Sequence, residues 1–571
     1  MYTVLPQTSE AFEALSWAEI EPWYTELTAT TLSEETLQPW MLQWSHLSEL
    51  VDETLRWLEI ICTQKTDDQE RARRRQRFLD EIYTHVQTFD QRIVQQLLAS
   101  GLEPEGFAIP LRNLRAEAEI FREANLPLLN EEKLLGVEYG NICGAQTVTW
   151  EGKEVSVTSL SPVLADPDRA LREHAWRTMH ERRIADRERF NETWVKLMRL
   201  RLQITRNAGY ESYRDYRWRQ MLRFDYTPDD CKAFHEAVEQ VFVPAASRLG
   251  EKRRQQLQIE TIRPWDTTVD PSTTEPPRLV SDVPALLEQC AGLFHQVDPQ
   301  LGSYFETMIR EQLLDLEERP FKAHGGYNLP LEVRKRPFIF GRVNSVRDIV
   351  PLICHEAGHA FHVFEVAHLP YLHQRKEEAI PIEFAEVAST SMEFIGSMHL
   401  HQAGLCTEAE AARLRIQHLE SMIQLLPWIV QGDAFQHWVY EHPEQSIDPN
   451  ACDQKWAELC RRYQPDVDWS GLDAVMKTGW QRILHFFEIP FYFIEYAFAE
   501  LGALQVWDNY LRDPQTALQQ YRHALSLGAT KPSPELFAAA GAEFTFDVPM
   551  LQRVLQLLTH NLEELEKQVS A

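Results

Sequence analysis

The segment "PLICHEAGHAFHVF", residues 351–364, places two imidazoles and a carboxylate among small and apolar residues. His355 and His359 are four residues apart, so on a helix they share one face and both rings can reach one ion. Glu356 follows His355 and can take a proton from water on the open side of that ion. This HExxH pattern is a zinc signature that arises by chance ~0.07 times in such a chain. Because burying these rings without a cation is expensive, the sequence predicts one Zn²⁺ ion here.

A tetrahedral zinc site needs a third protein ligand. His362 is the nearest candidate, but three ligands along one helix cannot surround an ion. The apolar helical stretch 380–398 carries Glu383, Glu386 and Glu393. Glu386 and Glu393 are seven residues apart and share a face, whereas Glu383 lies about 60° away from Glu386. We therefore expect Glu386 to bind the metal and Glu393 either to orient an imidazole or to form an ordinary ion pair.

Composition restricts the class of protein. The chain has 571 residues, 44% of them hydrophobic, and a formal net charge of −29. Such a charge repels nucleic acids and anionic membranes, so we expect neither as a partner. Its eight cysteines show no CxxC pair, and no signal peptide precedes the first helical pattern. These features predict a cytoplasmic protein with reduced thiols.

The periodicity of apolar residues predicts a mostly α-helical fold. Helical patterns cover residues 9–60, 67–99, 163–206, 228–258, 283–316, 407–441 and 549–568. Residues 146–160 alternate around Glu151-Gly152 and predict a β-hairpin. A second β pattern at 325–345 directly precedes the HExxH segment, so strand and motif helix should be neighbours. The apolar stretch 486–507 contains acidic residues that are costly in a bilayer, so we expect a core helix there.

Two boundaries are expected along the chain. The Pro-, Thr- and Ser-rich stretch 262–282 predicts a surface loop or a boundary before the catalytic part. For the domains, we expect an N-terminal helical region at 1–205, which includes the hairpin, and a zinc peptidase domain at 206–571.

Several segments together resemble a known family. "HEAGHAFH" and "AEVASTSMEF", with the glutamate 27 residues after the second histidine and an ExxS pattern, resemble the M3 family of zinc oligopeptidases, in particular its oligoendopeptidase F branch. "RNAGYESYRDYRW" (206–218), "RPWD" (263–266) and "PSPELFAAAGAEF" also fit this branch. The resemblance implies a prolate, two-lobed helical molecule with a deep central channel, a small β-sheet next to the motif helix, and peptide substrates.

The resemblance also implies a group of hydrogen-bond donors in "HFFEIPFYFIEYAF", residues 485–498. His485, Tyr492 and Tyr496 match the histidine and tyrosines that bind substrate and stabilise the oxyanion in the family. Independently of the family, Tyr492 and Tyr496 have the spacing of one helical face, and a phenol is a suitable donor to an oxyanion. An aromatic core stripe is the alternative, and which tyrosine donates stays open.

The expected activity is zinc-dependent hydrolysis of internal bonds in short, unstructured oligopeptides, with Glu356 as the general base. The segment "RPFIFGRVN" before the motif is expected to bind the peptide as an edge strand. Two alternatives remain open: a zinc metallocarboxypeptidase and a non-catalytic helical scaffold that binds peptides. The sequence does not give the oligomeric state.

Overall fold

The computed structural model describes residues 4–271 and 278–570, and 73% of the chain is helical. Its strands form two small sheets, one of two strands and one of three. The predicted mostly α-helical fold with a small sheet is confirmed. Packing divides the chain into two compact units, each built from three segments. Unit 1 comprises Met1–Ala118, Pro277–Arg415 and Gly502–Phe544, and unit 2 comprises Glu119–Pro276, Ile416–Leu501 and Thr545–Ala571.

The elements of unit 1 are mainly helices, with one sheet in the middle segment. They are α1 (Ser9–Glu13), α2 (Trp17–Ala29), α3 (Glu34–Gln64), α4 (Gln69–Phe78), α5 (Thr84–Ser100), α12 (Val283–Val297), α13 (Pro299–Arg310), β3 (Leu314–Asp315), β4 (Tyr327–Leu331), β5 (Arg336–Phe340), α14 (His355–Val366), α15 (Leu372–Arg375), α16 (Ile382–Ser397), α23 (Pro514–Ser526) and α24 (Ser533–Ala539).

Unit 2 contains the hairpin and the remaining helices. They are α7 (Leu126–Gly144), β1 (Thr147–Trp150), β2 (Lys153–Ser156), α8 (Arg169–Ala185), α9 (Arg187–Ala208), α10 (Tyr213–Gln220), α11 (Pro228–Gln256), α18 (Pro443–Ser446), α19 (Pro449–Tyr463), α20 (Asp473–Lys477), α21 (Leu484–Glu488) and α25 (Val548–Ser570). The division between the units falls inside three helices, α6 (Ala108–Ile120), α17 (Glu408–Glu441) and α22 (Phe493–Arg512).

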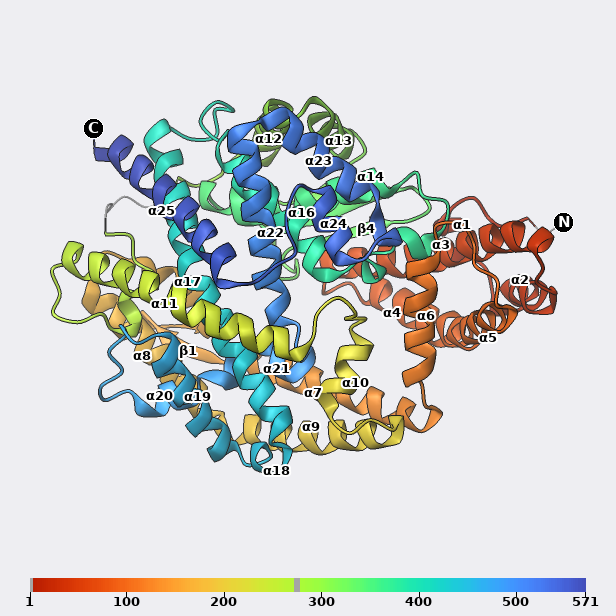
Figure 1. The fold of residues 1–571 in the computed structure, drawn as a ribbon, viewed down its shortest axis with the longest axis horizontal. Coiled ribbons are helices and arrows are strands. Elements are labelled where there is room, and N and C mark those ends of the chain that lie inside the picture. The colour runs from red at the N-terminus through yellow and green to blue at the C-terminus, as the bar shows by residue number, and fades with distance from the viewer. Residues whose placement is uncertain (1–3, 272–277, 571) are drawn as a thin grey trace. The chain divides into compact units, whose positions relative to one another are not determined.

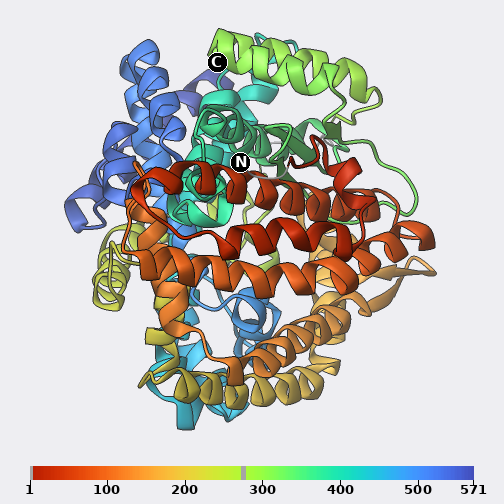
Figure 2. The same cartoon turned by 90° about the vertical axis from the view of Figure 1, so that its right-hand side faces the viewer.

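The N-terminal helices of unit 1 pack side by side, as the red and orange ribbons of Figure 2 show. The helical pattern predicted over 9–60 is three helices, because Ser16 and Ser33 each form a capping box that starts a new one. Along α3, Trp40, Trp44 and Leu47 recur at helical spacing, and each is at most 1% exposed. These side chains form the centre of an apolar core for this layer.

The three-stranded sheet has the strand order β3-β5-β4. β4 pairs with β5 antiparallel, with Tyr327 opposite Phe340, and β3 pairs with β5 parallel. Beyond β5, the Gly341 amide still donates to the Asp315 carbonyl at 2.9 Å. The expectation that "RPFIFGRVN" is an edge strand is therefore wrong, because this segment is hydrogen-bonded on both sides. In the described ranges the edge strands of this sheet are β3 and β4, each paired with β5 on one side.

The HExxH helix lies between this sheet and α16, and Figure 1 shows α14, α16, α23 and β4 next to one another. A π-helical turn, Ile349–Cys354, leads directly into α14. Such turns are frequent at functional sites. The predicted neighbourhood of the strands and the motif helix is thus present in the structure.

Gly358 sets the distance between α14 and α16. A Cβ atom at this position would lie 2.5 Å from both the Ala388 carbonyl oxygen and the Ser389 Cα. Real Cβ atoms do not approach backbone so closely, so any larger residue would force the two helices apart. The Tyr521 hydroxyl of α23 donates to the same Ala388 carbonyl at 2.8 Å and fixes α16 from another side.

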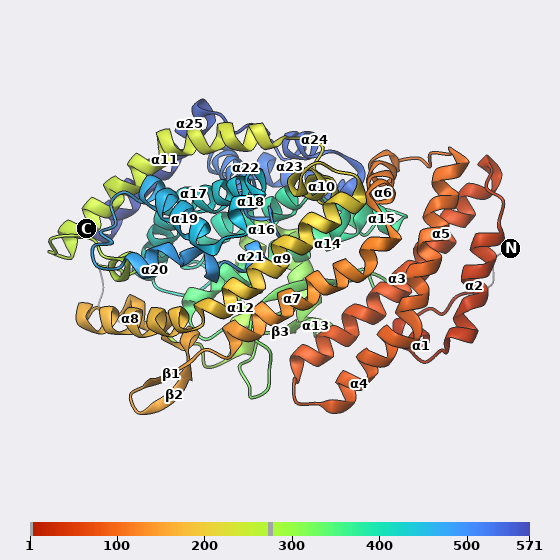
Figure 3. The same cartoon turned by 90° about the horizontal axis from the view of Figure 1, so that it is seen from below.

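The predicted hairpin is present in unit 2. β1 and β2 pair antiparallel, and Glu151 and Gly152 both have positive φ, as a tight two-residue turn requires. Figure 3 shows this hairpin, and also α7 and α9 running side by side.

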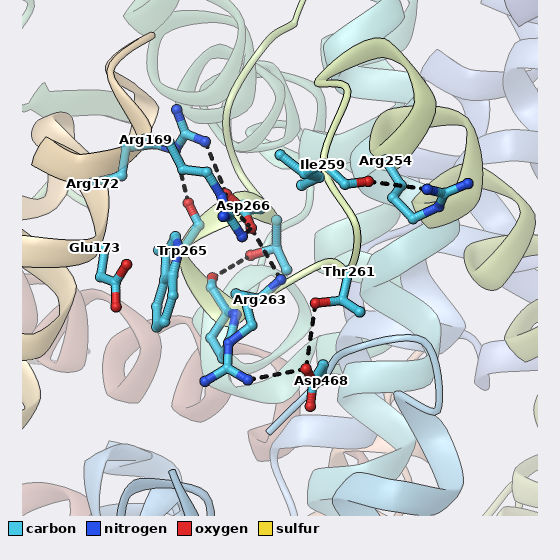
Figure 4. A network of polar contacts seen from close by, with 12 residues as sticks. Arg169, Arg172, Glu173, Arg254, Ile259, Thr261, Arg263, Trp265, Asp266 and Asp468 are labelled. Atoms are coloured by element: carbon cyan, nitrogen blue, oxygen red, sulfur yellow. Dashed lines mark hydrogen bonds and ion pairs between the residues drawn. The ribbon is translucent and has the colours of Figure 1, made fainter. Parts of the chain in front are cut away.

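The segment Arg263–Asp266 is an anchor inside unit 2 (Figure 4). Asp266 is fully buried and accepts hydrogen bonds from the guanidinium groups of Arg169 at 2.8 Å and Arg172 at 2.9 Å. Trp265 is buried beside it. The surface loop predicted for 262–282 is therefore wrong for its first part, whereas 272–277 lies outside the described residues.

Two further sequence predictions concern the whole chain. None of the helices in the described ranges combines the length and the apolar character needed to cross a bilayer. All eight cysteines lie in those ranges as free thiols.

Replacing Gly358 by alanine tests the close approach of the two helices. We expect Gly358→Ala to lower stability by about 1–3 kcal/mol, because the new methyl group overlaps the backbone of α16. Thermal unfolding measures the effect. Gly292→Ala is the control, since Gly292 lies in α12 with nothing within 4 Å of an added Cβ, and alanine should stabilise that helix slightly. Equal unfolding temperatures for the two variants would contradict this account.

Candidate metal centre and donor group

The two motif histidines and a glutamate converge in unit 1. The Nε2 atom of His355 lies 3.5 Å from Glu386 Oε2, and that of His359 lies 3.6 Å from the same oxygen. The ligand atoms of the three residues all lie within 4.8 Å of one another. Two nitrogens and one carboxylate oxygen at this spacing fit a zinc ion with an open coordination position.

Two hydrogen bonds fix the orientation of this set. Glu393 Oε1 lies 2.7 Å from His355 Nδ1, which leaves Nε2 directed toward Glu386. The Ser389 hydroxyl donates to Glu386 Oε2 at 3.0 Å. Partners of this kind orient the ligands of metal sites in proteins. Ser389 is the serine of the ExxS pattern, although its contact with Glu386 was not part of the prediction.

The charge of each of these groups changes the pKa values of the others. Burial favours a lower pKa for His355, but the hydrogen bond to Glu393 and the nearby carboxylates raise it to about 9. Burial favours a higher pKa for Glu386, but His359 and His355 lower it to about 2. Glu386 is therefore a carboxylate at neutral pH and available as an anionic ligand.

Glu356 lies beside the cluster on α14 and is 8% exposed. Burial raises the pKa of this carboxyl group, while the neighbouring His359 and His355 act in the opposite direction. A carboxylate with a raised pKa is a better proton acceptor than an ordinary glutamate.

The two competing candidates for the third ligand lie elsewhere. Glu383 is buried and accepts a hydrogen bond from the Ser533 hydroxyl at 2.5 Å. His362 is buried on α14, and its burial lowers its pKa to about 3. Neither residue belongs to the group of ligand atoms around Glu386.

The predicted donor residues lie together in unit 2. His485 Nε2 is 3.4 Å from the Tyr496 hydroxyl, and the rings of Tyr492 and Tyr496 have centroids 5.3 Å apart. Burial lowers the pKa of His485 to about 4, so this ring is neutral near pH 7. Tyr492 does not lie within a helix with Tyr496, as the spacing suggested, but directly precedes α22. The two rings nevertheless stack edge to face.

Three arginines hold the segment that connects His485 to Tyr492. Arg201 donates to the carbonyls of Phe486 at 2.8 Å and Phe487 at 2.6 Å. Arg217 donates to the Pro490 carbonyl at 3.1 Å. These contacts satisfy backbone groups that no regular helix or sheet uses.

The third arginine, Arg223, donates to the Phe491 carbonyl and, at 3.0 Å, to Glu495 of α22. Phe491 has a φ of 67°, which is rare for a bulky residue, and the Gln436 side chain accepts from its amide at 2.5 Å. Sequence reasoning missed these contacts, because their partners are more than 50 residues apart in the chain. The sequence feature that could have pointed to these contacts is the high density of arginine in 214–223.

Comparisons with known proteins show what this chain is similar to. A curated protein named oligoendopeptidase F homolog, from Borreliella burgdorferi, is 23% identical over 266 residues. The match covers 46% of this chain and 43% of that relative, so less than half of the length of either.

Solved structures match over nearly the whole chain. A structure of Pz peptidase A with an inhibitor has a TM-score of 0.86 and 26% identity, covering 96% of this chain and 98% of that one. Oligoendopeptidase F from Enterococcus faecium shares the fold, with a TM-score of 0.59 and 16% identity over 97% of this chain and all of that one. Residues 163–555, more than two thirds of the chain, match Peptidase family M3. The chain therefore belongs to peptidase family M3.

Proposed function

We propose that the protein is a zinc-dependent endopeptidase that hydrolyses internal bonds of short, unstructured oligopeptides. The observation that carries this proposal is the convergence of His355, His359 and Glu386 beside the buried Glu356. Membership of peptidase family M3 supports it. One Zn²⁺ ion would be held by the two imidazoles and the Glu386 carboxylate, and Glu393 would orient His355.

A zinc ion in this position supplies Lewis acidity, which polarises the scissile carbonyl and makes water more acidic. Glu356 accepts the proton of the attacking water and transfers it to the nitrogen of the leaving amine. Its burial suits both steps, because a raised pKa brings proton acceptance and proton donation closer to balance at neutral pH.

In this proposal, His485, Tyr492 and Tyr496 bind substrate and stabilise the oxyanion that forms when the carbonyl is attacked. The contact between His485 and Tyr496 supports a shared role for the two side chains. The hydroxyl group nearest to the reacting carbonyl would donate to its oxygen.

The substrates we propose are peptides of roughly five to twenty residues, because ordering a longer flexible chain costs more than its few contacts return. A folded protein already uses its backbone groups in its own secondary structure. The free side of β4 offers backbone groups to which an extended peptide could add as a strand. We retain a cytoplasmic location as a prediction, and likewise the domain boundary between residues 205 and 206.

Two variants separate the proposed base from the proposed ligand. Glu356→Gln should keep its zinc but lower kcat by roughly 10²–10⁴-fold, because it removes the proton acceptor and no ligand. Glu386→Ala should lose zinc, because two histidines on one helix bind weakly. Metal analysis and turnover measure both effects. Glu383→Gln is the control and should keep metal and activity; zinc loss there instead of in Glu386→Ala would reassign the third ligand.

The tyrosines can be tested by removing one hydroxyl at a time. Of Tyr492→Phe and Tyr496→Phe, the variant that lacks the oxyanion donor should lose roughly 10²-fold or more in kcat with little change in KM. Steady-state kinetics on a fluorogenic peptide measures this. Tyr510→Phe removes a hydroxyl of α22 that contacts His399, in unit 1, and serves as the control. Full activity of both test variants would make the pair an aromatic core stripe.

The position of cleavage distinguishes an endopeptidase from the metallocarboxypeptidase and the non-catalytic scaffold. We expect a ladder of peptides with increasing length to yield fragments from internal cleavage, and a chelator to stop the reaction. Mass spectrometry of the products reads the result. Successive loss of single C-terminal residues would favour a carboxypeptidase, and no turnover by the zinc-loaded protein would leave a peptide-binding scaffold.

A further inference from the structure

A second group of metal-ligating side chains is buried in unit 2. Cys231 and His235 are four residues apart on α11, and Asp433 and His437 are four residues apart on α17. Each pair therefore projects from one helical face. Ligand atoms of Cys231, Asp433 and His437 all lie within 4.8 Å of one another. All four side chains are at least nine-tenths buried.

The hydrogen bonds of this group are incomplete. His235 Nε2 lies 2.8 Å from Asp433 Oδ2, which accounts for one oxygen of the carboxylate. The other oxygen, Oδ1, is buried and has no hydrogen-bond partner in the described part of the chain. His437 Nε2 lies 3.3 Å from Asp433 Oδ2 but, among the same residues, also makes no hydrogen bond. A fully buried carboxylate with one unsatisfied oxygen is costly.

We propose that this group is a second metal site, in which Cys231, Asp433 and His437 bind one zinc ion and His235 orients the Asp433 carboxylate. A thiolate, an imidazole and a carboxylate are all zinc ligands, and the sulfur and nitrogen donors disfavour Mg²⁺ and Ca²⁺. The thiolate and the carboxylate together balance the two positive charges of the ion. The unsatisfied atoms of Asp433 and His437 would then be occupied.

Metal binding would change one contact of His437. Arg214 lies 3.3 Å from His437 Nδ1 and is also paired with Glu441 at 2.5 Å. In this contact Arg214 donates to Nδ1; when Nε2 binds a metal, Nδ1 carries the proton, so Arg214 would give up this contact and keep Glu441 as its partner. The neighbouring pair of Arg223 and Glu495 is neutral as a whole, so this pair does not oppose the ion.

The site would stabilise unit 2 and take no part in chemistry. Its ligands come from two helices and are buried, separate from the proposed catalytic metal ligands, so a bound ion would hold those helices together. It also adjoins the donor group, because the His437 ring packs against Phe491 with centroids 5.3 Å apart and Gln436 accepts from the Phe491 amide. Zinc would thus hold α17 against α11 next to Phe491, in the segment that leads to Tyr492.

Metal content tests the site independently of activity. For protein produced with added zinc and dialysed, we expect two zinc ions per chain in the wild type, and one each in Cys231→Ser and Asp433→Asn. Glu386→Ala should also retain one, at the second site. Cys460→Ser is the matched control, since Cys460 is a buried cysteine of unit 2 outside the cluster, and it should retain two. One zinc ion per wild-type chain, lost in Glu386→Ala, would overturn the proposal.

Cobalt gives a second readout, and its deciding result comes from the wild-type protein. A thiolate bound to Co²⁺ produces a near-ultraviolet charge-transfer band, whereas the residues proposed for the catalytic centre include no cysteine. Wild-type protein produced in cobalt medium should show this band, and Glu386→Ala should retain it. Bound cobalt without the band in wild-type protein would exclude Cys231 as a ligand. Because the proposed catalytic ligands include no thiolate, absence of the band and a failure of the catalytic proposal are distinguishable; Cys231→Ser should remove the band and Cys460→Ser should keep it.

Discussion

The candidate catalytic centre depends on the close approach of α14 and α16 at Gly358. Helices that meet through ordinary side chains keep their axes 8–10 Å apart. At Gly358 the backbone of α16 occupies the space of a missing side chain. Glu386 precedes this contact by two residues on α16, and His355 and His359 flank it on α14. A short carboxylate can therefore reach both imidazoles without either helix bending.

The same packing concentrates charge that a cation would balance. Glu356, Glu386 and Glu393 surround two imidazoles inside a largely apolar layer. Without a metal, protons must compensate the carboxylates, which is why the pKa values of His355 and His359 are raised. With a divalent ion in place the imidazoles can be neutral ligands. The geometry of the site thus follows from helix packing, and the raised pKa values of the imidazoles follow from the carboxylates that this packing places around them.

Local sequence patterns predicted the parts of this site that lie within one turn or one face of a helix. The HExxH spacing identified His355 and His359, and the phase of α16 selected Glu386 and Glu393 over Glu383. Both inferences use only the repeat of the α-helix, which fixes the direction in which each side chain of the segment projects. The roles of these residues remain proposals, but their positions follow from that repeat.

Contacts between distant segments could not be predicted in the same way. The segment Arg336–Phe340 is the central strand of its sheet, because β3, which comes from an earlier part of the chain, pairs with the side that β4 leaves open. Tyr492 lies outside α22 because Pro490 and the positive φ of Phe491 delay the start of that helix. The scattered cysteines gave no metal spacing either, since Asp433 and His437, which lie near Cys231, come from a distant part of the chain. The spacing of residues along one segment does not show which distant segment will pack against it.

The arginines of unit 2 show how the fold uses cations in a strongly acidic chain. The segment from His485 to Tyr492 comprises the short end of α21 and an irregular, largely buried stretch, so its carbonyls lack the partners that a continuing helix supplies. Arg201, Arg217 and Arg223 supply them, and a guanidinium group can do so because its donors point in fixed directions. Arg201 reaches two successive carbonyls, those of Phe486 and Phe487, with its two terminal nitrogens. The irregular backbone that places Tyr492 beside Tyr496 is therefore maintained by side chains from α9, α10 and the residues that follow α10, rather than by its own conformational preference.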